Sequence, residues 1–213
     1  MTKIYIVRHC ETVGNALRLF QGATDLDITQ TGEKQLKKLE ERFNPIDIDA
    51  VYSSPLIRTV KTAKAIIGSR NISIQLEKGL IELNGGVIEG KPFEEIIKEF
   101  EGFEDIWFNH PEDFDMPGGE PMRTSYERIF DTIINLAKNN PEKTIACATH
   151  GGIIRCLMCH IIYNDITRLK EVPIPINTSV SLLEIDDKNN IEIKFYNDYS
   201  HLSNDDFKDY FNE

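Results

Sequence analysis

Short apolar segments alternate with amphipathic segments through most of this chain, and this alternation constrains the fold more than any other feature. Residues 3–7 are apolar after the first lysine, which is typical of a strand buried on both faces of a parallel sheet. Residues 31–43 carry Leu36, Leu39 and Phe43 on one side of a predicted helix, opposite lysines and glutamates. The alternation predicts an α/β fold of three layers, a sandwich in which helices flank a mostly parallel sheet.

The other predicted elements follow the same pattern. We expect strands at residues 3–7, 49–53, 72–76, 144–149, 178–185 and 191–196. We expect helices at residues 31–43, 120–139 and 151–162, and one that follows Ser54, with Ser54 as its N-cap and Pro55 as its first residue. Residues 84–119 are less regular, and we interpret residues 1–213 as a single domain with an inserted cap segment at about 84–119. The acidic residues 204–213 are expected to be loosely held.

The charge balance limits the partners. The chain has 24 basic and 35 acidic residues and a net charge of −11, which argues against a general nucleic-acid or anionic-membrane surface. Apolar runs fall short of the roughly 20 residues that a membrane span needs. The N-terminus is charged too early for a secretion signal, so we expect a cytoplasmic protein. The oligomeric state stays open.

The four cysteines do not indicate a metal site. Cys156 and Cys159 form a C-x-x-C pair, but the sequence offers no second pair of ligands to complete a zinc site. We read them as small apolar residues of a buried helix. Asp, His and Cys residues show no convincing ligand spacing elsewhere, so neither a metal nor a cofactor is predicted. His110, His160 and His201 are interpreted as structural or surface residues.

Charged and catalytic residue types follow the predicted strands at the point where each strand ends. Arg8 and His9 follow the first strand, Arg58 comes after the second, Glu82 after the third, and His150 after the fourth. The carboxyl ends of parallel strands meet at one edge of a sheet, which is where open α/β sheets bind ligands. Two arginines gathered there suit a phosphoryl group, whose oxygens match the planar guanidinium. A neutral imidazole can attack phosphorus, and a carboxyl group can protonate the leaving oxygen.

The motifs around these residues resemble those of a known family. Arg8-His9-Cys10-Glu11-Thr12 with Asn15 resembles the RHGETxxN signature of the histidine phosphatase superfamily, also called the phosphoglycerate mutase-like family. Further matches follow in the order of the family: Gln21-Gly22, Ser53-Ser54-Pro55-Leu56-Ile57-Arg58-Thr59, Glu82 with Gly86, Glu89 and Gly90, Pro117-Gly118-Gly119-Glu120, and Thr149-His150-Gly151-Gly152. The resemblance covers about residues 3–185 and implies a phosphoglycerate mutase-like fold.

The resemblance also implies roles for individual residues. His9 would be the nucleophile, and Glu82 the general acid that later activates water. Arg8, Arg58 and His150 would bind the phosphoryl oxygens. The substrate-binding residues would be Thr12, Asn15, Gln21, Gly22 and Gly151. Because acidic residues crowd this region, Glu77 and Glu89 remain alternatives for the acid.

The chain departs from the family pattern at three places. Cys10 stands where glycine is usual, which would strain the backbone if that position required a positive φ. Two nearby arginines would lower the pKa of the Cys10 thiol, so we hypothesise that oxidation or alkylation there blocks the pocket. Pro121 replaces a common serine, and Val87-Ile88 lacks the usual aromatic residue.

The predicted function is metal-independent hydrolysis of a small phosphorylated metabolite, a phosphomonoester, through a phosphohistidine. The alternative within the family is a mutase that passes the phosphoryl group to a second hydroxyl of a sugar acid. Between Glu82 and Glu120 only Lys91 and Lys98 are cationic, which favours hydrolysis. An alternative of another class is an inactive module that binds phospholigands. The aromatic stretch at residues 100–114 could be a packed cap or a substrate platform.

Overall fold

A six-stranded sheet lies at the centre of the computed structural model, which describes residues 1–206. Its strand order is β3-β2-β4-β1-β5-β6. The strands are β1 (Thr2–Arg8), β2 (Ala50–Ser53), β3 (Ile74–Leu76), β4 (Thr144–Thr149), β5 (Val180–Ile185) and β6 (Ile191–Asp198). The first four in this order are parallel, and the β5–β6 hairpin pairs antiparallel with β1. The predicted mostly parallel sheet is confirmed.

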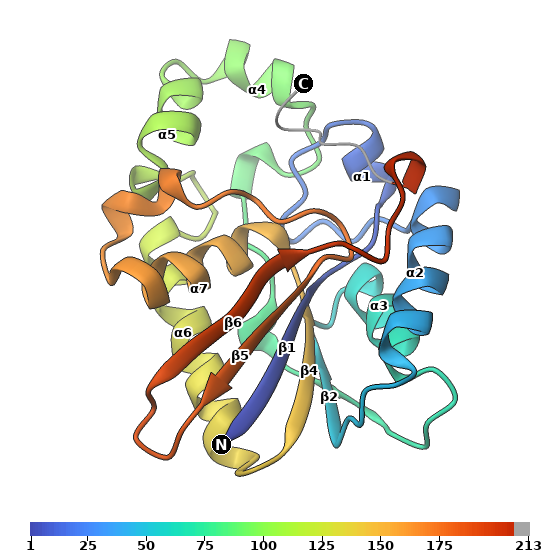
Figure 1. The fold of residues 1–213 in the computed structure, drawn as a ribbon. Coiled ribbons are helices and arrows are strands. Elements are labelled where there is room, and N and C mark those ends of the chain that lie inside the picture. Colours follow the sequence, from blue (N-terminus) through green and yellow to red (C-terminus); the bar gives the residue numbers. More distant parts are fainter. Residues whose placement is uncertain (207–213) are drawn as a thin grey trace.

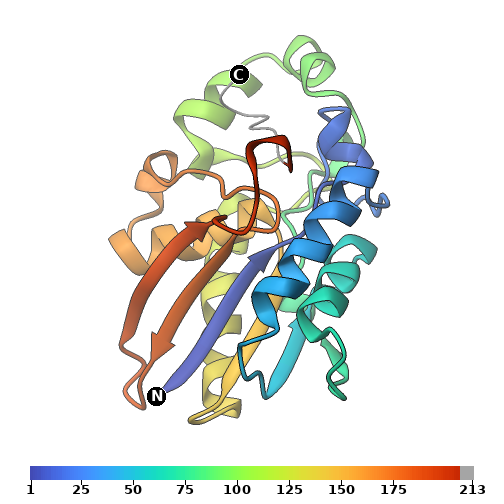
Figure 2. The ribbon, with the colours of Figure 1, turned by 45° about the vertical axis from the view of Figure 1, so that its right-hand side comes forward.

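Helices cover both faces of this sheet (Figures 1 and 2). One face carries α2 (Gln30–Phe43) and α3 (Ile57–Ile67), and the other carries α6 (Met122–Asn139) and α7 (Gly151–Tyr163). Alternate residues of β1 enter the two cores: Ile4 and Ile6 share a cluster with α6 and α7, and Val7 shares one with α2 and α3. Burial of each such side chain contributes about 1.5–3 kcal/mol. The two-sided burial explains why the strand is apolar throughout.

The segment predicted as a cap contains α4 (Phe93–Glu99) and α5 (Phe103–Asn109), which lie above the carboxyl ends of the parallel strands (Figure 1). Trp107 is the centre of its packing, with ring centroids at 5.4–6.0 Å from those of Phe20, Phe93, Phe103 and Phe114. Phe108 differs, because 48% of it is exposed. The rings of this stretch therefore pack against one another, and Trp107 and Phe108 also line a pocket. The short elements are α1 (Val13–Ala16), η1 (Lys78–Leu80), η2 (Gly86–Ile88), η3 (Pro111–Asp113), η4 (Ile166–Glu171) and η5 (Asn204–Asp206).

Two predicted helix starts are wrong by two residues. Helix α3 begins at Ile57 with Leu56 as its N-cap, because the Ser54 hydroxyl is hydrogen-bonded to His150 and does not cap the helix. Helix α6 begins at Met122 because Glu120 is held outside it. The Glu120 amide donates to the carbonyl of Asn84, which keeps this residue in the preceding loop.

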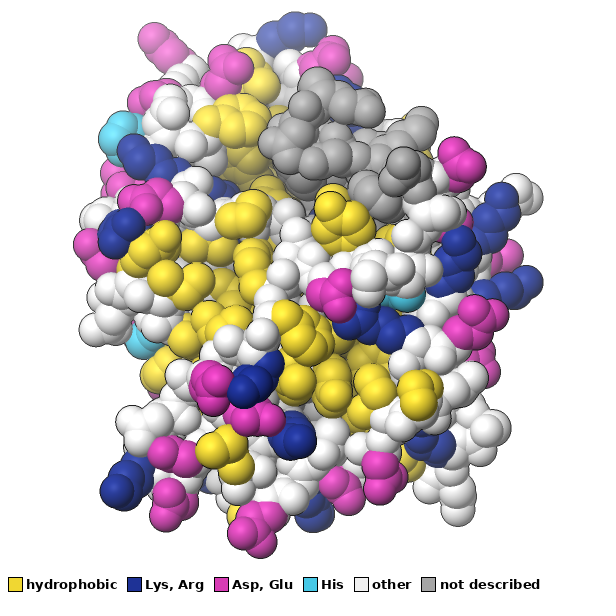
Figure 3. All heavy atoms as spheres, viewed as in Figure 1, with side chains coloured by type: hydrophobic (Ala, Val, Ile, Leu, Met, Phe, Trp, Pro, Cys, Tyr) yellow, Lys and Arg dark blue, Asp and Glu magenta, His cyan; other side chains and the backbone are white. Residues whose placement is uncertain are grey.

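The start of the acidic tail is held by the domain. Asp206 is buried; its carboxylate forms an ion pair with Lys38, and its carbonyl accepts a hydrogen bond of 2.8 Å from Gln35 Nε2. The expectation of a loose tail is therefore wrong at this residue, and residues 207–213 lie outside the described residues. On the face drawn in Figure 3, basic side chains are scattered among acidic ones. Within residues 1–206, no helix is both long enough and apolar enough to cross a membrane.

Candidate active site

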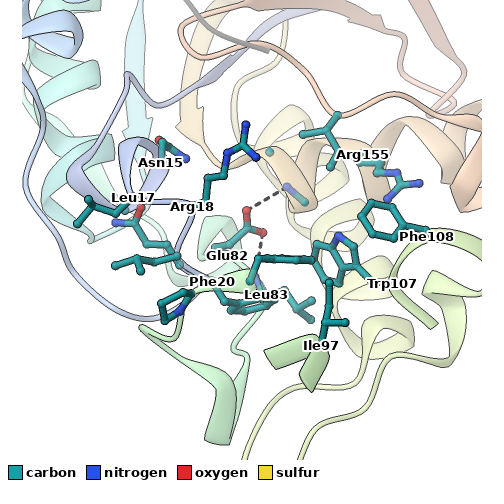
Figure 4. Close-up of a pocket in the computed structure, with 18 of the residues that line it drawn as sticks. Asn15, Leu17, Arg18, Phe20, Glu82, Leu83, Ile97, Trp107, Phe108 and Arg155 are labelled. Carbon is teal, nitrogen blue, oxygen red and sulfur yellow. Dashed lines mark hydrogen bonds between the residues drawn. The ribbon is translucent and has the colours of Figure 1, made fainter. Parts of the chain in front are cut away.

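A pocket of about 580 Å³ is lined by residues at the carboxyl edge of the sheet and by residues of the cap. Arg8 and His9, which come at the end of β1, line it together with Glu82. The first turn of α7 contributes Gly151 and Gly152. The cap contributes mostly apolar and aromatic side chains, so the polar groups of the sheet edge face a largely apolar wall (Figure 4).

His9 is buried and has a fixed tautomer. Its Nδ1 lies 2.7 Å from the carbonyl oxygen of Cys10. A carbonyl can only accept, so Nδ1 carries the proton and Nε2 keeps its lone pair. Burial, with the charges of Arg58 and Arg8, holds the pKa of His9 well below its ordinary value. The ring is therefore neutral near pH 7, as a nucleophile must be.

His150 is held beside His9, with ring centroids 5.2 Å apart. Arg58 Nε donates to His150 Nδ1 at 3.2 Å, so the His150 proton is on Nε2, which lies 2.8 Å from Ser54 Oγ. Burial, together with the charge of Arg58, holds the pKa of His150 well below its ordinary value. This ring is a neutral hydrogen-bond donor.

Arg58 is fully buried and connects the site to the loop at residues 21–24. Its Nη1 donates to the carbonyl of Thr24 at 2.8 Å, and its Nη2 to that of Gly22 at 2.7 Å. Burial lowers the pKa of Arg58 to about 10, so it remains a cation near pH 7. Arg58 and His150 are both fully buried and are absent from the lining of the empty pocket, although the His150 ring lies beside that of His9.

Glu82 faces the pocket while its carboxylate is anchored to the start of α7. Its Oε2 accepts a hydrogen bond from the Gly152 amide at 3.0 Å, and its Oε1 accepts one from the Leu83 amide at 3.0 Å (Figure 4). Oε1 also accepts a hydrogen bond from the Ile153 amide at 3.1 Å. Burial raises the pKa of Glu82, more than these donors and the arginines lower it. A carboxyl group with a raised pKa is suited to donate a proton.

The two other candidates for the acid have structural contacts. Glu89 accepts from the amides of Gly22, Ala23, Thr24 and Gly85 at 2.8–3.2 Å. Burial alone would raise the pKa of Glu89, but the hydrogen bonds from these donors together have the larger effect, so the pKa lies below its ordinary value. Glu77 caps η1 through the Gly79 amide, at 2.8 Å. Glu94 and Glu104 also line the pocket, but from the cap helices.

Three of the five predicted substrate-binding residues line the pocket, and the other two do not. Asn15, Gln21 and Gly151 line the pocket. Thr12 is buried and caps α1 by accepting the Asn15 amide, at 3.2 Å. Gly22 supports the loop and does not line the pocket. A Cβ atom on Gly22 would lie 1.9 Å from the carbonyl oxygen of Leu83, which requires glycine at this position.

Sequence reasoning missed two pocket cations, Arg18 and Arg155. Arg18 comes from the loop after α1 and has a positive φ of 53°, and Arg155 comes from α7. The spacing of Arg155, four residues after Gly151 on a predicted helix, was a usable signal. Arg18 follows no motif and lies in a loop, so the sequence offered no comparable signal for it.

The hypothesis of a reactive thiol at Cys10 is wrong. Cys10 is fully buried, and burial raises the pKa of its thiol to about 12. Its amide donates to Thr62 Oγ1 of α3 at 3.2 Å, and its φ is not positive, so the position does not require glycine. Cys156 and Cys159 are buried on α7, as predicted.

One group of possible metal ligands occurs in the described part of the chain. Ligand atoms of His110, Glu112 and Asp113 lie within 4.8 Å of one another on the cap. His110 and Asp113 are exposed, and Asp113 already pairs with Arg123 at 3.3 Å. None of the three lines the pocket, so they take no part in its chemistry.

Comparisons with known proteins agree with this geometry. A model of the histidine phosphatase superfamily (branch 1) matches residues 4–199. Phosphoserine phosphatase 1 of Hydrogenobacter thermophilus is 27% identical over 194 residues, which are 91% of this chain and 92% of that protein. A probable phosphoglycerate mutase GpmB of Salmonella choleraesuis is 32% identical over 162 residues, 76% of this chain and 75% of that protein. The solved structure of YhfR from Bacillus stearothermophilus matches with a TM-score of 0.90 and 27% identity, and the match covers 94% of this chain and 99% of YhfR.

The resemblance predicted from the motifs is thus confirmed, and with it the prediction of a phosphatase-type enzyme. The phosphoglycerate mutase-like sandwich predicted as the fold is confirmed as well. Because the family match spans almost the whole chain and the fold agrees with it, this protein belongs to the histidine phosphatase superfamily, branch 1.

Proposed function

We propose that this protein hydrolyses a small phosphorylated metabolite, with His9 as the nucleophile and Glu82 as the general acid. One observation carries the proposal. His9, whose Nε2 is unprotonated, and Glu82, whose carboxyl group has a raised pKa, face the same pocket. Related phosphatases, such as the phosphoserine phosphatase of Hydrogenobacter thermophilus, support this class of substrate.

The first half of the reaction forms a phosphohistidine. The Nε2 lone pair of His9 attacks phosphorus, and the bond from phosphorus to the leaving oxygen breaks. Glu82 gives its proton to that oxygen, so the product leaves as a neutral alcohol. In the second half, the Glu82 carboxylate takes a proton from water, the water oxygen attacks phosphorus, and the N–P bond breaks to release phosphate and neutral His9.

Fixed charges of the protein stabilise the transferred group. Arg8 lines the pocket, and its Nη1 donates to the carbonyl of Pro175, which orients the guanidinium. Arg58 adds a buried positive charge beside His150, and this charge also lowers the pKa of His9. His150, whose ring lies beside that of His9, can donate its Nε2–H to a phosphoryl oxygen that takes the place of Ser54 as acceptor. Cations and donors of this kind supply the charge that a divalent ion gives to other phosphatases, so we infer a metal-independent reaction.

Mutase chemistry is the second candidate, since the GpmB relative is described as a probable phosphoglycerate mutase. The pocket geometry favours hydrolysis, because Leu17 and Phe108 line the pocket while 60% and 48% of these residues are exposed. Such an open rim admits water to the phosphohistidine. An inactive binding module is disfavoured, because His9 and Glu82 both face the pocket.

The test is a phosphate-release assay of the purified protein on a panel of phosphorylated metabolites and p-nitrophenyl phosphate, with excess EDTA. We expect activity to survive EDTA and to fall by about 10⁴-fold or more in His9→Ala. His110→Ala is the matched control, since His110 is exposed on the cap, and it should keep full activity. Absence of any hydrolysis, or loss of activity with EDTA, would contradict the proposal.

A further inference from the structure

Arg155 presents a positive charge to the pocket beyond the reacting groups. Gly151, Gly152 and Arg155 all line the pocket, and their spacing places them on one face of α7. Gly151 and Arg155 are one turn apart, about 6 Å along the helix axis. Arg155 therefore stands one helical turn beyond Gly151, where an added Cβ atom would lie 3.1 Å from Arg8 Nε.

The Arg155 guanidinium is anchored at one edge only. Its Nε donates to the carbonyls of Leu169 and Val172, at 3.0 and 2.8 Å. Its terminal nitrogens donate no hydrogen bond within residues 1–206, and Arg155 forms none of the salt bridges there. The two carbonyls fix the plane of the guanidinium and leave its outer edge to a ligand.

Nearby groups do not neutralise this charge. Arg155 is half-buried, and burial lowers its pKa. The pocket carboxylates Glu94 and Glu104 belong to the cap and form no salt bridge with Arg155. A partly desolvated cation without an anion is costly, and a bound anion would repay that cost.

Apolar side chains surround this end of the pocket. Trp107 and Phe108 from the cap, with Leu169 and Ile174 after α7, line the pocket together with Arg155. In Figure 4, Arg155 and Phe108 lie on the side of the pocket opposite Asn15 and Leu17. A ligand that reaches from the phosphoryl site to Arg155 therefore crosses apolar surface and ends at a guanidinium.

We propose that Arg155 selects phosphomonoesters whose leaving group carries a carboxylate on a short apolar framework. The outer edge of a guanidinium offers two parallel N–H groups, which match the two oxygens of one carboxylate. A carboxylate brings a single negative charge, which one arginine balances. This inference rests on the proposed phosphatase activity.

The test compares two aryl phosphates of nearly the same shape, 3-carboxyphenyl phosphate and 3-carbamoylphenyl phosphate, which differ in charge. The parent enzyme should prefer the carboxylate. In Arg155→Met the ratio of kcat/KM for the two substrates should fall by about 10- to 100-fold, the effect of a lost hydrogen bond between charged groups, mostly through KM. Arg155→Lys keeps the positive charge but loses the pair of parallel N–H groups of the guanidinium. This variant should retain part of the preference for the carboxylate substrate.

Arg168→Met is the matched control. Arg168 lies in η4 beside the same loop, is exposed and pairs with Glu171, so its loss should leave both rates unchanged. An unaltered ratio in Arg155→Met and Arg155→Lys, or an equal fall on both substrates, would mean that Arg155 only fastens η4 to α7. If the parent hydrolyses both substrates without preference, this inference fails and the proposed function stands. If it hydrolyses neither aryl phosphate nor any metabolite of the panel, the proposed function fails.

Discussion

The hydroxyl of Ser54 and the Nε2 of His150 lie 2.8 Å apart, and this hydrogen bond determines where the proton of His150 points. Arg58 donates to the other nitrogen of the ring, so the Nε2 proton faces Ser54. A phosphoryl oxygen in the pocket would compete with Ser54 for that proton. Ser54 thus satisfies a buried donor as long as no ligand does.

Ser54→Ala should therefore lower stability more than it lowers catalysis. The buried Nε2–H loses its acceptor, which costs about 1–3 kcal/mol in the free energy of unfolding. Vanadate offers oxygen acceptors, so it should raise the melting temperature of the variant more than that of the parent. Ser179→Ala is the control, since Ser179 is buried and its Oγ has no hydrogen-bond partner within the described residues. Equal vanadate shifts in Ser54→Ala and the parent would show that His150 keeps its proton away from the ligand.

Stability should fall as the pH drops through 6.5. His9 and His150 are buried with pKa values well below 6.5, and burial lowers the pKa of His201 to about 4. Below pH 6.5 the unfolded chain binds protons at these histidines and the folded chain does not. Each histidine therefore lowers the free energy of unfolding by up to about 1.4 kcal/mol for every pH unit below 6.5. Glu82 has a raised pKa, so in the folded protein it takes up its proton at a higher pH than in the unfolded chain. Its protonation therefore increases the free energy of unfolding as the pH falls, but only once the pH is below that raised pKa.

Urea unfolding at pH 7.5, 6.5 and 5.5 measures this dependence. A free energy of unfolding that stays constant from pH 7.5 to 5.5 would mean that the two active-site histidines take up protons in the folded protein at the same pH as in the unfolded chain.

Alkylating reagents should not inactivate the native enzyme. All four cysteines are buried, and burial raises the pKa of the Cys10 thiol to about 12, so very little thiolate exists at pH 8. Mass spectrometry after iodoacetamide treatment should find Cys10 unmodified until urea unfolds the chain. Rapid loss of activity that vanadate prevents, and that is absent in Cys10→Ser, would show instead that the thiol opens to the pocket.

Trp107 and Phe108 are adjacent but should respond differently to substitution. Trp107 packs against four aromatic rings, so Trp107→Ala should cost about 3–5 kcal/mol of stability and reduce turnover of all substrates together. Phe108 lines the pocket with about half its surface exposed, so Phe108→Ala should change the ranking of leaving groups. Thermal melting and kcat/KM on the metabolite panel distinguish the two. If both variants change the ranking of substrates in the same way, Trp107 and Phe108 do not differ in role.

The sequence predicts well what depends on local patterns. A strand buried on both faces must be apolar throughout, so β1 and β4 were readable, and Arg8, His9 and His150 follow directly from where those strands end. Glu82 was ambiguous because its rival Glu89 is distinguished only by distant contacts with the amides of Ala23 and Thr24.

Contacts between distant elements explain the failures. Cys10 is adjacent to the nucleophile in the chain, yet Thr62 of α3 and the surrounding core, not the arginines, determine its environment. Ser54 looks like a helix cap in sequence, but its hydroxyl is hydrogen-bonded to His150. Arg155 faces the pocket only because the loop after α7 returns to hold it.

The measurement that most directly tests the mechanism is a burst experiment on Glu82→Gln with p-nitrophenyl phosphate. The nitrophenolate is a weak base and needs little protonation, so His9 should still be phosphorylated, while water attack on the phosphohistidine loses its base and slows by about 10²- to 10⁴-fold. We expect a burst of one nitrophenol per active site and acid-labile phosphate on His9. Glu89→Gln is the matched control, and it should turn over without a burst. Equal slowing of both steps, with no burst and no labelled His9, would contradict the assignment of His9 and Glu82.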